Sequence, residues 1–230
     1  MALINESIKL IKYYKFINHN LIYNNKAINR YKKNTFEISA DKAGNLEKLK
    51  KLIHNIKNCS LKNNAKNMVF GDGNPKSKIM LIGEAPGANE DEEGLPFVGR
   101  AGKLLDKMLD AINLDRKKVY ISNIINYRPP DNRRPTDDEI KRYLPFITKH
   151  IEIINPKILI LLGSDPLKYL LDDDDGMMKK RGKWLNYIFG EQSLPCLTLL
   201  DPGFLIRRPE YKRETWKDIL NLKDRIEELI

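Results

Sequence analysis

Apolar residues along this chain form two kinds of pattern, short continuous runs and longer stretches in which they recur every three or four positions. Short apolar runs that end at glycine, proline or polar residues are typical of buried strands. Recurrence every three or four positions is typical of amphipathic helices. The expected strands are residues 78–82, 118–125, 157–162 and 195–200, and the expected helices are residues 41–56, 101–114, 136–153, 166–171 and 210–230. The expected buried side of the last helix is formed by Trp216, Ile219, Leu220 and Leu222.

The expected strands and helices alternate along the chain, which indicates an α/β fold. We expect a three-layer α/β/α architecture with a central, mostly parallel sheet of four strands joined by right-handed crossovers. Ligands of such sheets bind at the carboxyl ends of the strands. All the expected strands lead into loops with glycine, proline or polar residues, so we expect the functional site at that edge.

Residues 1–40 differ in composition from the rest of the chain. Ile4, Ile8 and Ile11 share one helical face, whereas residues 19–35 are dense in Asn, Lys and Tyr without a clear period. Low hydrophobicity there does not offset the entropy of ordering. We therefore expect a partly helical or loosely ordered extension over residues 1–40 and one folded domain over residues 41–230. A DNA contact through lysine and tyrosine is the alternative role for the extension.

The composition favours a soluble, globular and basic protein. Of the 230 residues, 41% are hydrophobic and 31% are charged, and the net charge is +10. A basic surface attracts polyanions such as DNA, although a lysine-rich surface without a partner has the same composition. No apolar run approaches the roughly 18 residues of a membrane helix, the first residues lack a secretory pattern, and two cysteines give no disulfide framework. We expect a cytoplasmic monomer.

The stretch after the first expected strand combines glycine, proline, acids and an aromatic. It reads GEAPG at residues 83–87 and GLPFVGRAG at residues 94–102. Pro86 has no backbone donor and Gly87 permits positive φ, so the chain turns sharply there. A long acidic surface loop is the simpler interpretation, but a position at the carboxyl end of a buried strand favours a binding loop.

Three further motifs follow in order: VYISN at residues 119–123, RPPDNR at residues 128–133 and DPGFLIR at residues 201–207. Together with the glycine-rich stretch they resemble the uracil-DNA glycosylase superfamily, and specifically its family-four branch, over residues 59–223. The resemblance implies a base-excision repair enzyme that flips uracil out of DNA. Such an enzyme hydrolyses the N-glycosidic bond with water as the nucleophile and leaves an abasic site.

The resemblance implies that Phe97 stacks on the flipped base and that Asn123 reads its edge. A side-chain amide offers a donor and an acceptor together. Uracil presents O4 as an acceptor and N3–H as a donor, and cytosine reverses both. Without the resemblance, Phe97 would be interpreted as a loop anchor and Asn123 as a turn residue. The other substrate contacts implied by the first motif are Gly83, Ala85, Pro86 and Gly87.

Three carboxylates are candidates for catalysis. Ala85 stands where related branches carry a water-activating aspartate, so Glu84 and Asp91 are the nearby acids that orient water or oppose the developing sugar cation. For Asp91, a solvated or helix-capping role is the alternative. Asp201 stands where the family has a histidine that donates to uracil O2.

The replacement of this histidine by Asp201 bears directly on the rate. Loss of one preorganised donor costs roughly 3–4 kcal/mol of transition-state stabilisation, or about 100- to 1000-fold in rate. An ionised Asp201 has no proton to donate, whereas a protonated Asp201 donates if burial raises its pKa. Alternatively, Asp201 faces the sugar and supports the cation.

The resemblance also implies residues that contact DNA. The last motif begins with His-Pro-Ser or His-Pro-Ala in the family, and Leu205 stands where the family inserts an apolar wedge into the vacated stack. The other expected DNA contacts are Pro202 and the arginines Arg100, Arg128, Arg133, Arg207 and Arg208.

Family-four enzymes hold an iron–sulfur cluster through four cysteines, and the matching positions here are Ile56, Cys59, Tyr127 and Tyr143. A cluster needs about four thiolates, and only Cys59 supplies one. We therefore expect no iron–sulfur cluster, no other metal and no cofactor, with that volume filled by packing. Residues 172–175 are all aspartate but lack a ligand pattern, so we expect a solvated turn.

Two further functions remain open. One is a DNA-binding or partner-binding member of the superfamily with weak or no glycosylase activity, which Asp201 favours. The other is a glycosylase with altered damaged-base specificity. Phe97 and Asn123 favour a uracil-DNA glycosylase whose partner is uracil-containing DNA, single- or double-stranded.

Overall fold

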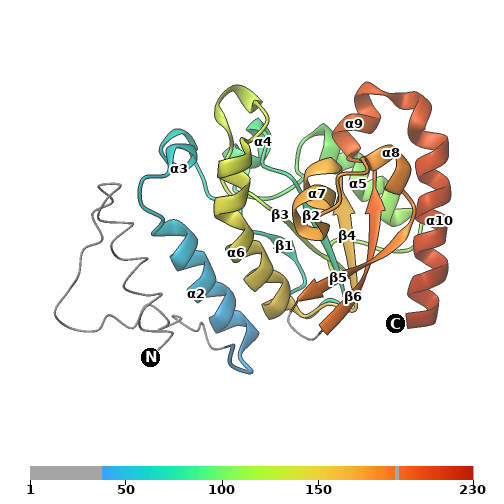
Figure 1. Ribbon diagram of the computed structural model, residues 1–230, viewed down its shortest axis with the longest axis horizontal. Helices are drawn as coiled ribbons and strands as arrows, with labels where there is room; N and C mark the ends of the chain where they lie inside the picture. The colour runs from blue at the N-terminus through green and yellow to red at the C-terminus, as the bar shows by residue number, and fades with distance from the viewer. Residues whose placement is uncertain (1–37, 190–191, 230) are drawn as a thin grey trace, which may run out of the picture. The chain divides into compact units, whose positions relative to one another are not determined.

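Residues 38–189 and 192–229 are described by a computed structural model of the chain (Figure 1). The chain divides into two units, residues 1–37 and residues 38–230. The extension expected over residues 1–40 falls almost entirely outside the described residues, so its structure and its boundary stay predictions. The second unit has the α/β fold that the alternating patterns predicted.

A six-stranded sheet forms the centre of the second unit, in the order β1-β3-β2-β4-β6-β5. The four inner strands run parallel to one another, and each edge strand is antiparallel to its neighbour. The strands are β1 (Asp72–Gly73), β2 (Ile79–Gly83), β3 (Tyr120–Asn123), β4 (Ile158–Leu162), β5 (Trp184–Phe189) and β6 (Gln192–Leu199).

The mostly parallel sheet is confirmed, and the expected number of strands is wrong. The four expected strands are the inner ones, and β2, β3 and β4 are buried along their whole length. The described part of the chain adds β1 and β5 at the edges. Edge strands do not require a continuous apolar run: β1 has only two residues, and most of β5 is half-buried or exposed.

Helices cover both faces of the sheet and give the expected three layers (Figure 1). On one face, Leu105 of α5 and Ile219 of α10 join a core cluster with Leu81 and Ile160 of the sheet. Towards the other face, α7 packs on β2 and β4 and contacts α6, which in turn packs against α2. These helices are α2 (Lys42–His54), α5 (Arg100–Asp110), α6 (Asp137–Ile154), α7 (Ser164–Leu171) and α10 (Lys212–Leu229).

The buried stripe of α10 runs through Thr215, Ile219 and Leu222. Burial of Ile219 and Leu222 is therefore confirmed, whereas Trp216 is 45% exposed and Leu220 is 39% exposed. Each of these two residues follows a buried position by one, and one step along a helix turns the side chain by about 100°. The expectation that both lie on the buried side is wrong.

Short helices occupy segments that the patterns assigned to loops, because runs of three to six residues are too short to show a helical period. Two of them, α4 and α9, follow β2 and β6 directly and carry parts of the motifs. No helix in residues 38–189 and 192–229 combines the length and apolar character of a membrane span. The short helices are α3 (Ser60–Asn64), α4 (Ala88–Glu93), α8 (Met177–Lys180), α9 (Pro202–Arg207), and the 3-10 turns η1 (Pro130–Asn132) and η2 (Pro209–Tyr211).

Candidate active site

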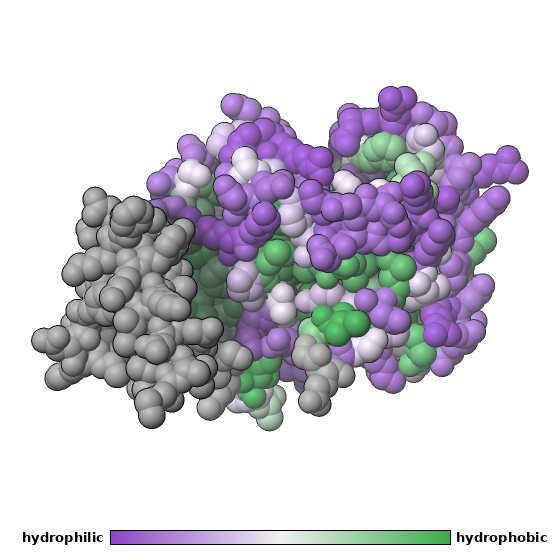
Figure 2. Space-filling model, viewed as in Figure 1, coloured by the Kyte–Doolittle hydropathy of each residue, from purple (hydrophilic) through white to green (hydrophobic). Residues whose placement is uncertain are grey.

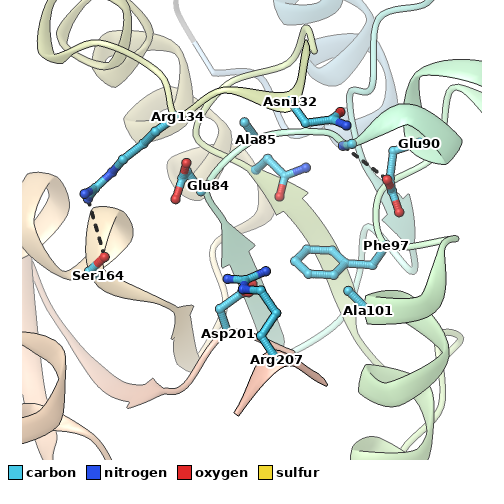
Figure 3. Close-up of a pocket in the computed structure, with 12 residues that line it drawn as sticks. Glu84, Ala85, Glu90, Phe97, Ala101, Asn132, Arg134, Ser164, Asp201 and Arg207 are labelled. Carbon is cyan, nitrogen blue, oxygen red and sulfur yellow. Dashed lines mark hydrogen bonds between the residues drawn. The ribbon is translucent and has the colours of Figure 1, made fainter. Parts of the chain in front are cut away.

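A cavity of about 490 Å³ lies at the carboxyl ends of the inner strands (Figure 3). It is bounded by the loop after β2, the end of β3, the start of α7 after β4 and the start of α9 after β6. This is the edge at which the sequence predicted the functional site. Of the residues singled out from the sequence, those that line it are Glu84, Ala85, Gly87, Phe97, Asn123, Asp201 and Arg207.

Gly83 allows an aromatic ring and an amide to meet beside the cavity. Gly83 and Asn123 are paired neighbours at the ends of β2 and β3. A Cβ atom at residue 83 would lie 2.5 Å from Asn123 Oδ1 and 2.6 Å from Phe97 Cζ. Any larger residue would displace the amide or the ring, so the close packing of Phe97 and Asn123 requires this glycine.

The loop that carries Phe97 is held in a constrained conformation. Phe97 has a φ of 56°, in the left-handed region that residues other than glycine seldom adopt. Its carbonyl oxygen accepts a hydrogen bond from the guanidinium of Arg116, and a Cβ atom at Gly102 would overlap the same oxygen. The Phe97 side chain is only 8% exposed and joins the core cluster while it lines the cavity. Phe97 therefore both anchors the loop and presents its ring to the cavity.

The side-chain oxygen of Asn123 is buried and has no hydrogen-bond partner among the described residues. A buried polar atom without a partner costs about 1–3 kcal/mol of folding free energy. In the wall of a cavity, such an atom is suited to accept a hydrogen bond from a donor on a bound molecule.

Glu90 joins the two halves of the glycine-rich stretch. Its carboxylate accepts hydrogen bonds from the backbone N–H groups of Gly87, at 3.1 Å, Val98, at 3.0 Å, and Gly99, at 2.8 Å. Glu90 is not among the residues that the sequence motifs indicated. The capping-box spacing, an acid three residues after the helix cap at Gly87, is the signal that identifies it.

Asp91 lies outside the cavity lining. It is 2% exposed, and its Oδ1 atom accepts hydrogen bonds from the backbone N–H groups of Lys66, at 2.9 Å, and Asn67, at 3.1 Å. Its carboxylate thus fixes the segment before β1, a structural role that differs from the solvated or helix-capping role left open by the sequence. We infer no catalytic role for Asp91. Pro86 is also buried and absent from the lining.

Three carboxyl groups line the cavity, those of Glu84, Glu90 and Asp201, and backbone N–H groups engage that of Glu90. Burial raises the pKa of Asp201, and the charge of Arg207 partly opposes that rise. Asp201 also caps α9, since its Oδ1 accepts a hydrogen bond from the Phe204 backbone N–H at 2.9 Å. Burial likewise raises the pKa of Glu84, Arg134 lowers it, and a nearby negative charge on Asp201 raises it further. Both groups therefore retain protons to a higher pH than solvated carboxyls.

Arg134 lines the cavity but was not singled out from the sequence, which pointed to Arg133 instead. Its Nε donates to Asp165 Oδ2 at 3.1 Å, a second guanidinium nitrogen pairs with Asp165 Oδ1, and Ser164 Oγ lies at 3.5 Å (Figure 3). Asp165 is fully buried at the start of α7. The arginine is therefore fixed by a contact between distant segments, which no local motif reveals.

The residues expected to contact DNA lie in different surroundings. Leu205 is 1% exposed and contacts the region between α5 and α10, so it is not free to act as a wedge in this conformation. Pro202 is buried as well. Arg133 pairs with Glu139 at 2.7 Å. The remaining arginines, of which only Arg207 lines the cavity, are Arg100, Arg128, Arg207 and Arg208.

The four positions that match the cluster ligands of the resembled family include a buried, packed group. Cys59 Sγ lies 3.3 Å from Tyr143 Oη, and Cys59, Tyr127 and Tyr143 are at most 5% exposed. Burial raises the pKa of both tyrosines, which keeps them neutral. One sulfur, two phenols and the half-buried Ile56 do not fit a cluster that takes four thiolates. In the described part of the chain, no group of three metal-ligating side chains converges elsewhere.

The family model and the relatives that match this chain all belong to one family. A family model described as the uracil DNA glycosylase superfamily matches residues 70–221. The type-4 uracil-DNA glycosylase of Sulfurisphaera tokodaii is 37% identical over 184 residues, which cover 78% of this chain and 84% of that protein. That of Saccharolobus solfataricus is 39% identical over 186 residues (78% and 86%), and that of Thermotoga maritima is 38% identical over 168 residues (72% and 86%).

Proposed function

The chain belongs to the uracil-DNA glycosylase superfamily, and we propose that it removes uracil from DNA in base-excision repair. The reaction is hydrolysis of the N-glycosidic bond of deoxyuridine after the nucleotide has been flipped into the cavity. The observation that carries the proposal is the buried, unpartnered Asn123 Oδ1 beside the ring of Phe97 in a cavity at the carboxyl edge of the sheet.

Uracil matches the hydrogen-bonding capacity of this amide. Asn123 Oδ1 accepts the N3–H of uracil, and the amide N–H₂ donates to O4. Cytosine has an acceptor at N3 and a donor at N4, so both bonds would be replaced by unfavourable contacts. The ring of Phe97 stacks on the flipped base, and the constrained backbone of its loop keeps the ring in place before the base arrives.

Bond cleavage transfers the C1′–N1 electron pair to the departing uracil and leaves a cationic sugar. Ala85 cannot activate water. Glu84 is the acid after β2 that lines the cavity, where it opposes the sugar cation and orients the water that attacks C1′. Its raised pKa favours acceptance of the proton that this water loses. The products are uracil and an abasic site.

Asp201 limits the rate of this reaction. In its ionised form it repels the leaving anion. In its protonated form, which burial favours by raising the pKa, it donates to uracil O2. We propose weak to moderate turnover in the wild type. The same residue favours a second candidate function, DNA binding with little or no turnover. Absence of uracil release would favour that function over the glycosylase.

DNA is the partner, and we propose that the chain binds it as a monomer at the edge that carries the cavity. Figure 2 shows hydrophilic side chains gathered over this edge, with the surface hollowed between the region of α4 and α6 and the region of α9. Arg100, Arg128, Arg133 and Arg208 are proposed phosphate contacts there. We propose uracil-containing DNA, single- or double-stranded, as the substrate.

One assay tests the function. A labelled oligonucleotide with a single uracil is incubated with the protein, treated with alkali and resolved on a gel. Strand cleavage at the uracil position, absent from matched oligonucleotides with cytosine or thymine there, is the expected result. If uracil strands stayed intact at high protein concentration while the protein still bound DNA, the result would favour the DNA-binding function over the glycosylase. Cleavage only at another damaged base would indicate altered specificity.

A further inference from the structure

Arg207 projects into the cavity as a cation without a fixed partner. It lines the cavity, and Figure 3 shows its guanidinium beside Asp201, directed towards the space between Glu84 and Phe97. Within residues 38–189 and 192–229 it forms no ion pair and no side-chain hydrogen bond. Arg134, the other arginine of the lining, differs in this respect because its guanidinium is held by the buried Asp165.

The charge of Arg207 acts on two of the carboxyl groups that line the cavity. It lowers the pKa of Glu84 and of Asp201, each of which burial raises. The Asp201 carboxylate caps α9 through the Phe204 N–H at 2.9 Å, and within the described residues no hydrogen bond or ion pair joins it to the guanidinium. The N–H groups of Arg207 are therefore close enough to polarise the cavity and remain available to a bound molecule.

Gly203 lies against both Asp201 and Arg207 and leaves room for the Asp201 carboxylate. A Cβ atom at residue 203 would lie 2.9 Å from Asp201 Oδ1 and 3.5 Å from Arg207 Nη1. The distance to Asp201 Oδ1 is shorter than Cβ atoms adopt in real structures, whereas the distance to Arg207 Nη1 is an ordinary van der Waals contact. The motif of the resembled family has serine or alanine at this position and histidine at 201, so the chain departs at two positions that touch the same space.

We propose that Arg207 is a catalytic residue, whose guanidinium donates a hydrogen bond to uracil O2 and stabilises the leaving uracil anion in place of the family's histidine. This inference rests on the proposed function. As the C1′–N1 bond breaks, its electron pair moves onto N1 and O2 of uracil, and the guanidinium binds O2 without giving up a proton. Uracil leaves as the anion and takes its proton from solvent, while water adds to C1′ and loses a proton to Glu84 or to solvent.

The charge arrangement favours Arg207 over the other candidates. Guanidinium groups stay protonated in proteins, so this donor is present at every pH at which the protein folds. Asp201 donates only in its protonated form. Arg134 already neutralises a buried carboxylate, and moving it onto a substrate would leave Asp165 buried without its counter-charge, which is strongly unfavourable.

The test separates chemistry from DNA binding. Arg207→Gln, Arg207→Lys and the wild type are compared by single-turnover uracil release at saturating enzyme, and the Kd for the same oligonucleotide without uracil is measured by fluorescence anisotropy. Arg213→Gln is the matched control, because Arg213 is exposed on α10, lies outside the cavity lining and loses the same charge. We expect Arg207→Gln to lower the single-turnover rate by about 100- to 1000-fold, Arg207→Lys to restore part of it, and Arg213→Gln to match the wild type.

Each other outcome has a defined meaning. Equal rates for the wild type and Arg207→Gln would overturn the inference and leave the proposed function intact. A raised Kd with an unchanged saturated rate would also overturn it and make Arg207 a phosphate contact. A wild type that binds DNA but releases no uracil would end the proposed function and this inference together. Because Arg207 is exposed, its variants are expected to fold.

A double variant gives an independent check. If Arg207 replaces the missing histidine, its contribution should shrink once a histidine is restored. In the Asp201→His background, Arg207→Gln is expected to lower the single-turnover rate by less than about tenfold. An undiminished loss of about 100-fold or more in that background would show that Arg207 acts elsewhere than on O2. Gly203→Ala, which crowds the Asp201 carboxylate, is expected to lower the wild-type rate.

Discussion

At the residue scale, Asn123 is the residue whose surroundings most directly indicate a role in base recognition. Its amide lies at the end of β3 beside Gly83 and the ring of Phe97, and its Oδ1 is buried without a partner among the described residues. When a donor on a ligand forms a hydrogen bond with a buried acceptor that lacks a partner, the new bond contributes favourable binding free energy. Recognition of uracil N3–H would supply that donor.

Asn123→Asp is expected to lower uracil release by about 100-fold or more, because an ionised carboxylate loses the donor to O4 and repels it. Single-turnover release from a uracil oligonucleotide measures the effect. Asn113→Asp is the matched control, since Asn113 is exposed and absent from the cavity lining. Unchanged release by Asn123→Asp would remove Asn123 from base recognition.

Asp201→His is expected to raise the single-turnover rate, by up to the roughly 100- to 1000-fold that one preorganised donor contributes. The substitution removes a group that repels the leaving anion when ionised and adds a donor near O2. A rate equal to or below that of the wild type, from a variant with an unchanged melting temperature, would show that the position is not near the leaving group.

The pH profile of the wild type reports on the same residue. Burial raises the pKa of Asp201, so the neutral form persists below that pKa and the carboxylate forms above it. Uracil release is therefore expected to fall as pH rises through the raised pKa. Asp201→Asn keeps a capping oxygen and a donor but does not titrate, and it is expected to lose this falling limb. A limb that persists in Asp201→Asn would belong to another group.

At the scale of elements, short helices at strand ends place the chemistry. α4 begins directly after its cap Gly87 and places Glu90 where it joins both halves of the glycine-rich stretch. α9 begins directly after its cap Asp201, so a side chain that caps a helix also faces the cavity. In α9 the side chains of Leu205 and Arg207 diverge, one into the core and the other into the cavity.

The packed group around α3 and α6 carries a prediction about iron. Cys59 meets the phenol of Tyr143 at 3.3 Å, and Tyr127 is buried nearby. With three of the four thiolates replaced, we expect the purified protein to be colourless and to contain no stoichiometric iron, measured by absorbance and elemental analysis. Anaerobic purification provides the control against oxidative loss, and about four irons per chain in that preparation would contradict the prediction.

At the scale of the whole molecule, the net charge of +10 and the hydrophilic edge around the cavity suit a polyanionic partner. The arginines proposed as phosphate contacts come from three separate segments of the chain. Basic contacts of this kind position DNA without reading its sequence, so base recognition is left to the cavity.

Affinity for an unmodified duplex is expected to fall steeply with salt, because each phosphate contact releases condensed counterions. The logarithm of the binding constant should decrease linearly with the logarithm of the salt concentration, by about 0.9 per contact for a duplex. Fluorescence anisotropy over a sodium chloride series measures this slope. A binding constant that is the same at low and physiological ionic strength would contradict a DNA-facing basic edge.

The sequence by itself determined the inner strands, the long helices and the edge at which the site lies. Continuous apolar runs and helical spacing persist over enough residues to be read without tertiary information, and the carboxyl edge follows from the parallel topology. The motifs also identified most of the cavity lining, from Glu84 to Arg207. The replacement of the family's histidine by Asp201 and of three cluster cysteines by other residues could be read directly from the sequence.

Only the tertiary structure decided the rest, because it depends on contacts between distant segments. Edge strands and short helices are too brief to show a period. The ion pair between Arg134 and Asp165, the burial of Leu205 and the use of Asp91 as a backbone anchor each involve a partner that local sequence does not specify. Arg207 faces the same cavity as Glu84 and Phe97 for the same reason, since these three residues come from separate segments that meet only once the fold has formed.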